Sequence, residues 1–223
     1  FEMTGGQLQV SRFLSASREF FESRGQLLTA RLSLPEDVVL NAAGIELPRW
    51  NVQAKRLVFC QGFAARENPW FGAMPFDPAK GEIVTVRVPG LEEQRILHRG
   101  IWLAPMGNQL FRVGATYDRD HLDNLPTPQG RAELCEQLQH FLKRPFEVVE
   151  HQAAVRPIVI GRHPVAGRHP RYPQLACFNG LGSKGSLQAP FVAGQLACFL
   201  HDVGTMEDVF DIRKRFPNLD KSS

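Results

Sequence analysis

Residues 179–190 read NGLGSKGSLQAP, and the glycines within 180–185 have the spacing G-x-G-x-x-G. A dinucleotide-binding loop has this spacing between a strand and a helix. Residues 174–178 (QLACF) supply a short strand, and residues 190–200 supply a helix entered through Pro190, which suits a first turn. The residues that follow do not continue as a second parallel strand. The stretch is therefore either a tight strand-to-helix turn or an anion or carbonyl site at a helix N-terminus.

The composition is typical of a globular chain. Of the 223 residues, 43% are apolar and 22% are charged, and the net charge is only +3. This length allows one or two domains with a sizeable core. The basic residues are scattered, so we expect no nucleic-acid partner. No stretch approaches the run of about 20 apolar residues that crosses a bilayer, so we expect no membrane span.

The cysteines and histidines indicate neither a disulfide framework nor a metal site. The four cysteines lie far apart and form no C-x-x-C pair: Cys60, Cys135, Cys177 and Cys198. Each has apolar neighbours, which is typical of buried thiols in a reducing compartment, and we therefore expect a cytoplasmic protein. The seven histidines form no ligand pair with nearby acids, so no metal is expected.

Hydrophobic periodicity predicts helices at 7–24 and 128–143, in addition to the helix after the glycines. Strands are predicted at 27–32, 36–41, 44–48, 55–61, 82–88, 96–104, 109–116 and 145–155. Residues 158–173, rich in Pro, His and Arg, are predicted as a loop. This order predicts a mixed sheet with helices on its faces, in an α+β or mixed α/β fold.

Residues 153–194, AAVRPIVIGRHPVAGRHPRYPQLACFNGLGSKGSLQAPFVAG, resemble the C-terminal region of a known family. The family is that of the D-amino-acid oxidase-like (DAO) FAD-dependent oxidoreductases. In it an Arg-Pro ends a strand of the substrate domain, and a Pro-x-x-Gly turn follows. A short strand, a glycine-rich loop and a helix facing the flavin come next. Here Arg156-Pro157 and 164–167 match the first two elements, and QLACF, the glycines and the following helix match the rest.

Three further segments resemble the same family in the same order. AKRLVFCQGF (54–63) resembles the strand that returns the chain to the FAD domain, and FDPAKGEIVTVRVPG (76–90) resembles the start of the long substrate-domain strands. GIWLAPMGNQLFRVGATYD (100–118) resembles a hairpin that ends in Val-Gly-Ala-Thr. The resemblance implies an antiparallel or mixed sheet substrate domain with helices, joined to the C-terminal part of a FAD-binding Rossmann-like domain.

The resemblance also implies a division of the chain. Residues 1–62 would form segments of the two domains ending in the return strand, residues 63–157 the substrate-binding domain, and residues 158–223 the flavin-contacting segment. The family's N-terminal G-x-G-x-x-G unit, which holds the ADP part of FAD, has no counterpart here, and we expect it upstream of Phe1. No cysteine stands near Arg156 or in the glycine loop, so the implied FAD is noncovalent.

The implied flavin contacts come from the backbone. Six residues would line the N1/C2=O edge of the ring: Gly180, Leu181, Gly182, Ser183, Lys184 and Gly185. Amide donors and a helix dipole there would stabilise the negative charge that develops on reduction. The alternatives are a helix cap for Ser183 and a solvated side chain for Lys184. Gly62 would let the backbone pass close to the nucleotide, although a turn at a strand end explains it nearly as well.

The implied substrate contacts come from two side chains. Arg156 stands where some relatives clamp a substrate carboxylate, which a guanidinium binds bidentately. The alternative for Arg156 is a structural ion pair within the sheet. Tyr117, just past Val-Gly-Ala-Thr, could project toward the substrate, and the alternative is an aromatic packed at the sheet end.

The resemblance thus implies an FAD-dependent oxidoreductase that moves a hydride from the C–H of an amine or amino acid to flavin N5, with a 2-hydroxy acid as the further option. The partner would be a small molecule, and no oligomeric state is predicted. Two alternatives stay open. The chain could be a non-catalytic binding or assembly module with this architecture, or the substrate-side subunit of a split flavoenzyme.

Overall fold

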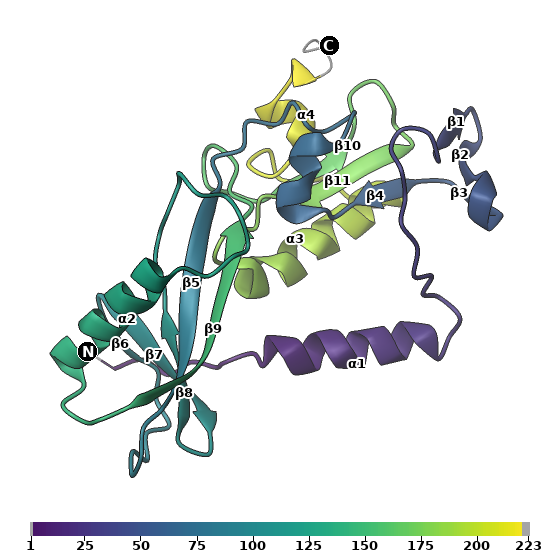
Figure 1. Ribbon diagram of the computed structural model, residues 1–223. Coiled ribbons are helices and arrows are strands. Elements are labelled where there is room, and N and C mark those ends of the chain that lie inside the picture. The colour runs from purple at the N-terminus through teal and green to yellow at the C-terminus, as the bar shows by residue number, and fades with distance from the viewer. Residues whose placement is uncertain (1, 220–223) are drawn as a thin grey trace. The chain divides into compact units, whose positions relative to one another are not determined.

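The computed structural model describes residues 2–219 and divides into two compact units (Figure 1). Unit 1 comprises Phe1–Cys60, Ala64–Met74 and Pro164–Ser223, and unit 2 comprises Gln61–Phe63 and Pro75–His163. Helices and mixed sheets alternate along the chain, which confirms the predicted α+β class. Among the helices within residues 2–219, none is long and apolar enough to cross a membrane.

Unit 2 is built on a five-stranded antiparallel sheet of order β6-β7-β8-β5-β9. Its strands are β5 (Ala79–Arg87), β6 (Leu97–Arg99), β7 (Ile101–Gly107), β8 (Leu110–Gly114) and β9 (Glu147–Arg156). Strand β5 pairs with β8 on one side and with β9 on the other. Since side chains alternate between the two faces of a strand, β5 supplies both the core of this unit and its opposite face.

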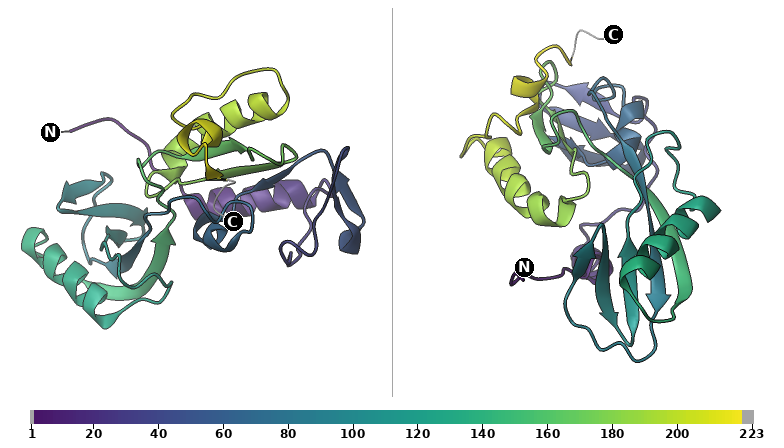
Figure 2. Two further views of the ribbon diagram at one scale, coloured as in Figure 1. Left: turned by 90° about the horizontal axis from the view of Figure 1, so that it is seen from above. Right: turned by 90° about the vertical axis from the view of Figure 1, so that its left-hand side faces the viewer.

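Helix α2 (Pro128–Phe141) covers one face of this sheet, as the right view of Figure 2 shows. The helix starts at a cap, because the Thr127 hydroxyl accepts a hydrogen bond from the amide of Gly130 at 3.0 Å. Leu134 and Leu138, one turn apart, are fully buried against the sheet. They pack over a layer of buried strand residues: Val84, Val86, Leu103, Phe111 and Val113. Burial of each such side chain contributes roughly 1.5–3 kcal/mol.

Unit 1 contains a three-stranded sheet of order β10-β11-β4, whose strands are Val165–Arg168, Leu175–Asn179 and Leu57–Phe59. Strand β11 is parallel to β4 and antiparallel to β10. Strand β4, within the strand predicted at 55–61, thus pairs in parallel with the strand that leads into the glycines. Such a parallel pair belongs to a helix-covered α/β layer.

Helix α3 (Gly185–Leu200) packs on this sheet through Val192 and Leu196. Its C-terminal carbonyls are held by Arg168 of β10, whose Nη2 donates to the carbonyls of Phe199 at 3.0 Å and Leu200 at 3.3 Å. A cation at a helix C-terminus also complements the helix dipole. Arg168 therefore fixes the end of α3 to the sheet.

The remaining elements of unit 1 are short or exposed. A small antiparallel sheet is formed by β1 (Val39–Asn41), β2 (Gly44–Leu47) and β3 (Val52–Ala54), and α4 spans Ile212–Arg215. Short 3-10 helices span Pro48–Trp50 in unit 1 and Gly62–Glu67. Helix α1 (Val10–Glu22) is amphipathic, yet none of its residues is buried. The helix predicted at 7–24 is thus confirmed, but its apolar side chains remain exposed.

His169 has a structural role in unit 1. Its Nδ1 accepts hydrogen bonds from the amides of Arg171 at 3.1 Å and Tyr172 at 3.2 Å. An accepting Nδ1 carries no proton, so the neutral ring holds its proton on Nε2, which lies 3.1 Å from the carbonyl of Trp70. His169, which is buried, therefore joins β10 to the loop that carries Trp70.

Several local predictions were wrong. Residues 27–32 form no strand, and no described segment pairs with them. Residues 96–104 form two strands, because Gly100 has a φ of +78° and turns the chain between β6 and β7. The predicted loop 158–173 contains β10, so its residues 164–167 are mostly strand rather than turn. Helix α3 begins at Gly185, which places Pro190 inside the helix rather than at its first position.

The cysteines also differ from expectation. Cys177 is buried, and burial raises the pKa of its thiol. Cys60 and Cys198 are exposed, and Cys135 is intermediate. Their sequence neighbours Phe59 and Leu134 are buried, but adjacent residues of a strand or helix point in different directions, so the neighbours' burial does not extend to the cysteines.

Candidate flavin and substrate sites

The glycine loop, residues 180–185, joins β11 to α3 within unit 1. Gly180 and Gly182 have φ angles of +73° and +54°, a backbone conformation that residues with a Cβ rarely adopt. The amide of Gly180 donates to Asn179 Oδ1 at 2.8 Å, which holds the start of the loop. The two glycines thus allow the chain to pass directly from strand into helix.

The loop leaves several amide donors open. Within residues 2–219, the amides of Gly182, Ser183, Gly185 and Ser186 form no hydrogen bond. The side chains of Ser183 and Lys184 are exposed, and the residue before the helix, Lys184, makes no side-chain cap. Open amides at the positive end of a helix attract partial negative charge. These donors therefore fit the oxygen-bearing edge of a flavin ring.

Arg156 ends β9 in unit 2, and its guanidinium lies over the backbone of Gly81 on β5 (a Cβ at Gly81 would collide with it). Nη1 donates to the carbonyl of Lys80 at 3.2 Å, and Nη2 donates to the carbonyl of Thr116 at 3.1 Å. These two bonds aim the guanidinium along the sheet and leave its other N–H groups available.

Within residues 2–219, Arg156 forms no ion pair with an acidic side chain. The side chain is half-buried, and burial lowers the pKa of its guanidinium from its ordinary value. A guanidinium nevertheless stays charged at neutral pH. A half-buried positive charge without an acidic partner is a favourable place for an anion.

Tyr117 follows β8 and lies beside Arg156, with the guanidinium carbon 5.5 Å from its ring centroid. The ring is exposed. The hydroxyl of Tyr117 lies 3.5 Å from Arg119 Nη2, and Arg119 forms an ion pair with Asp77. Tyr117 also lines a cavity of about 690 Å³ on the α2 side of the sheet. The structure thus brings Arg156 and Tyr117 together, and Tyr117 is not packed into a core.

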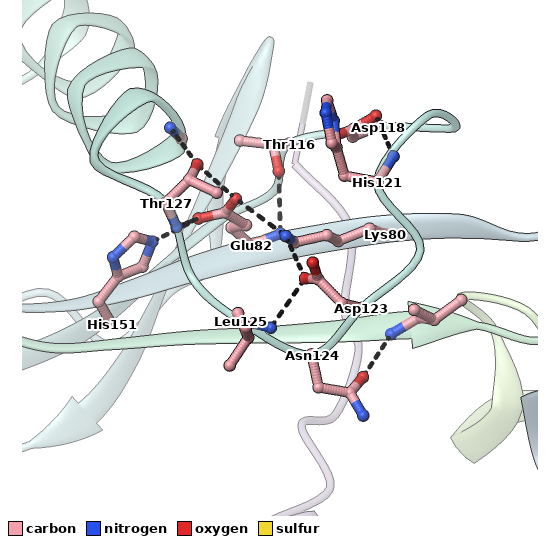
Figure 3. A network of polar contacts seen from close by, with 12 residues as sticks. Lys80, Glu82, Thr116, Asp118, His121, Asp123, Asn124, Leu125, Thr127 and His151 are labelled. Carbon is pink, nitrogen blue, oxygen red and sulfur yellow. Dashed lines mark hydrogen bonds and ion pairs between the residues drawn. The ribbon is translucent and has the colours of Figure 1, made fainter.

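A buried charge network lies on the α2 face of the same sheet (Figure 3). Lys80 is fully buried and donates to Asp123 at 2.6 Å, which lowers the pKa of Asp123. Glu82, also buried, accepts from the amide of Thr127 at 2.9 Å and from its hydroxyl at 2.8 Å. His151 Nε2 lies 2.7 Å from Glu82 Oε2, close enough for an ion pair but outside hydrogen-bond geometry.

This network holds the segment 116–127, which begins beside Arg156 and carries Tyr117. The Thr116 hydroxyl accepts from the amide of Glu82 at 2.9 Å, and Asn124 Oδ1 accepts from the amide of Val155 at 3.2 Å. Lys80 and Glu82 were not predicted as site residues from the sequence. The signal was available, because both residues fall on the alternate positions of β5 that lead into the core residue Val84.

The remaining predicted residue, Gly62, lies in unit 2 with a φ of +56°, and a Cβ there would contact the ring of Pro157. Leu181 is partly buried within the glycine loop. The predicted residues thus form two groups. Arg156, Tyr117 and Gly62 belong to unit 2, and the glycine loop belongs to unit 1. Within residues 2–219, no three His, Cys, Asp or Glu side chains are arranged to hold a metal ion.

The family profile of FAD dependent oxidoreductases (DAO) matches residues 1–199, which is most of the chain. The chain belongs to the DAO family. Solved structures of similar fold include iminodiacetate oxidase (IdaA) from Chelativorans sp. BNC1, with a TM-score of 0.72 and 20% identity over 87% of this chain. Glycine oxidase from Geobacillus kaustophilus has a TM-score of 0.65 and 22% identity over 79% of this chain.

A curated relative of this DAO-family chain is more similar in sequence. The tRNA 5-methylaminomethyl-2-thiouridine biosynthesis bifunctional protein MnmC of Idiomarina loihiensis is 29% identical over 133 residues, which is 57% of this chain. The match spans 22% of the MnmC protein, 55% of the iminodiacetate oxidase and 49% of the glycine oxidase. The chain therefore spans about half the length of these solved relatives and about a fifth of MnmC.

Proposed function

We propose that this DAO-family chain takes part in the FAD-dependent oxidation of a small amine or amino acid that carries a carboxylate. Arg156 is the observation that carries the proposal. Its half-buried guanidinium keeps further N–H groups available for a ligand and forms no ion pair within residues 2–219. A substrate carboxylate would supply the missing anion through charge-assisted hydrogen bonds.

Each residue then has a defined task. Arg156 binds and orients the carboxylate, and Tyr117 limits the access of water to that guanidinium. The open amides of the glycine loop hold the N1/C2=O edge of a noncovalent FAD and stabilise negative charge there. A bound flavin would supply the hydride acceptor for the oxidation of the substrate C–H. Residues 63–157 would form the substrate-binding domain and residues 158–223 the flavin-contacting segment.

The relatives support an amine that carries a carboxylate. Iminodiacetate oxidase and glycine oxidase are both named for such compounds. The alternative of a 2-hydroxy acid would use the same carboxylate contact. A cytoplasmic location stays a prediction.

A second candidate for the substrate is an amine attached to a modified nucleoside. It is favoured by the 29% identity to MnmC, which is named for a methylaminomethyl group on thiouridine. The two candidates are distinguished by supplying free amino acids and modified tRNA separately to the same holoprotein.

The proposal is tested on the purified holoprotein. We expect a yellow preparation whose flavin absorbance bleaches under anaerobic conditions when a mixture of amino acids and N-substituted glycines is added. If acetate or propionate slows this bleaching by competing with the substrate, a carboxylate contact is supported. A protein that stays colourless and binds no added FAD would contradict the oxidoreductase function and favour a non-catalytic binding or assembly module. If FAD binds only after a second polypeptide is added, the chain is the substrate-side subunit of a split flavoenzyme.

A further inference from the structure

The face of the unit 2 sheet opposite α2 carries the side chain of Trp102 as well as that of Arg156. Within the described part of this unit, α2 is the only α-helix, and it lies on the other face. Pairing places Trp102 of β7 opposite Gly114 of β8, which in turn pairs with Ile83 of β5. Ile83 lies two residues from Gly81, over which the Arg156 guanidinium lies. Trp102 and Arg156 therefore share one sheet face.

Two glycines make room for these two side chains. A Cβ at Gly81 would collide with the guanidinium of Arg156, and a Cβ at Gly114 would collide with the indole of Trp102. The indole also lies close to the side chain of Ile83. The guanidinium and the indole therefore both lie directly against the backbone of the sheet, which fixes their distance from it.

The two groups are close enough to contact one small molecule. Gly81 and Ile83 are separated by about 7 Å, the rise of two residues along a strand. A carboxylate bound by the guanidinium extends about 3 Å from it. The indole lies over Gly114, on the strand about 5 Å to the side of Ile83, so the guanidinium and the indole are about 8–9 Å apart. A ring that begins two or three bonds from that carboxylate therefore reaches the indole.

Trp102 has unused binding capacity. Its side chain is half-buried, and within residues 2–219 its indole N–H donates to no acceptor and its ring contacts no other aromatic ring. A tryptophan that is only half-buried on a sheet face offers a flat apolar surface together with one polar donor. Flat rings pack favourably on such a surface.

We propose that Trp102 determines substrate specificity by packing against a flat, ring-bearing substituent of the carboxylate that Arg156 binds. This inference rests on the proposed function of Arg156 and names the class of compound that fits beside it. A carboxylate with a ring two or three bonds away is preferred to the same carboxylate without the ring. Both compounds make the same carboxylate contact with Arg156. The preference between them comes from the contact of the ring with Trp102.

The test measures the affinity of the holoprotein for two probes, 3-phenylpropionate and propionate, by calorimetric titration. We expect the wild-type protein to prefer 3-phenylpropionate. Trp102→Leu keeps apolar volume over Gly114 but removes the flat ring, and should lower the ratio of the two affinities about 3- to 10-fold. Trp102→Phe keeps a flat ring and should retain most of the preference. Leu110→Ala, at the distant end of the same face, is the matched control and should leave the ratio unchanged.

The outcomes separate this inference from the proposed function. If the wild-type protein binds both probes but the ratio is the same in Trp102→Leu, the role of Trp102 is wrong while the carboxylate contact stands. If the wild-type protein binds neither probe, the proposed function of Arg156 fails. If Arg156→Ala weakens both probes by the same factor and Trp102→Leu weakens mainly 3-phenylpropionate, both are supported.

Discussion

Replacing Arg156 by alanine is expected to raise the KM for the carboxylate substrate about 100- to 1,000-fold while the flavin stays bound. The variant removes the half-buried guanidinium that forms no ion pair within residues 2–219. The carboxylate would then enter a partly desolvated site with no opposite charge. Steady-state kinetics give the KM, and the absorbance of the purified holoprotein gives its flavin content.

Two comparisons make the result specific. Arg87→Ala removes an exposed arginine at the other end of β5 and should change the KM less than twofold, because the side chain is away from the site. Arg156→Lys keeps the charge but loses the planar pair of donors, and should recover only part of the affinity. If Arg156→Ala fails to fold and Arg156→Lys has a normal KM, the bonds to Lys80 and Thr116 make Arg156 a structural residue.

Replacing Glu82 by leucine is expected to lower the free energy of unfolding of unit 2 by about 3–5 kcal/mol. Glu82 is 4% exposed and accepts both the amide and the hydroxyl of Thr127, the cap of α2. Without it, the fully buried Lys80 keeps Asp123 as its one acidic partner among the described residues. Removing one member of a buried charge network leaves the others desolvated and unpaired.

Urea unfolding measures this loss, and tryptophan fluorescence can isolate the unit. Trp102 belongs to unit 2, whereas Trp50 and Trp70 belong to unit 1, so the double variant Trp50→Phe/Trp70→Phe leaves a signal from unit 2 alone. Glu147→Leu, at an exposed position of β9, is the matched control and should change the stability by less than about 0.5 kcal/mol. A loss below about 1 kcal/mol for Glu82→Leu would mean that the network is not stabilising.

The helices and the long strands of the fold could be predicted from sequence because each carries a regular hydrophobic period. Leu134 and Leu138 recur at helical spacing and are buried in α2, and the alternation of EIVTVRV matches β5. Short strands are harder to predict. Residues 27–32 alternate suitably but have no partner among the described strands, whereas β10 is formed by Val165–Arg168 because β11 pairs with it.

The start of α3 was missed for a related reason. Proline is tolerated in the first turn of a helix, so the sequence predicts a helix that starts at Pro190. In the structure the carbonyl of Lys184 already accepts the amides of Leu187 and Gln188, and the helix has begun before the proline. The consequence is functional, because the glycine loop and the helix N-terminus are continuous rather than separated by four residues.

The candidate site was only partly accessible from sequence. Arg156 and the glycine loop were predicted from the resemblance to the DAO family. The structure gives a physical reason for both predictions, because Arg156 and the loop each keep N–H groups available for a ligand. Trp102 was missed because its significance depends on which strands are neighbours. The sheet order β7-β8-β5-β9 places Trp102 and Arg156 on one face, and no local pattern encodes that order.

Helix α1 has a consequence for the order in which the chain loses structure. None of its residues is buried, so its amides are protected mainly by its own backbone bonds, and its side-chain contacts are exposed, such as the pair of Arg18 with Glu22 at 2.9 Å. An isolated helix of this length is marginal in water. Amide hydrogens of α1 should therefore exchange with deuterium through local fraying within seconds to minutes. Those of β5, paired on both sides, should exchange only when unit 2 opens as a whole.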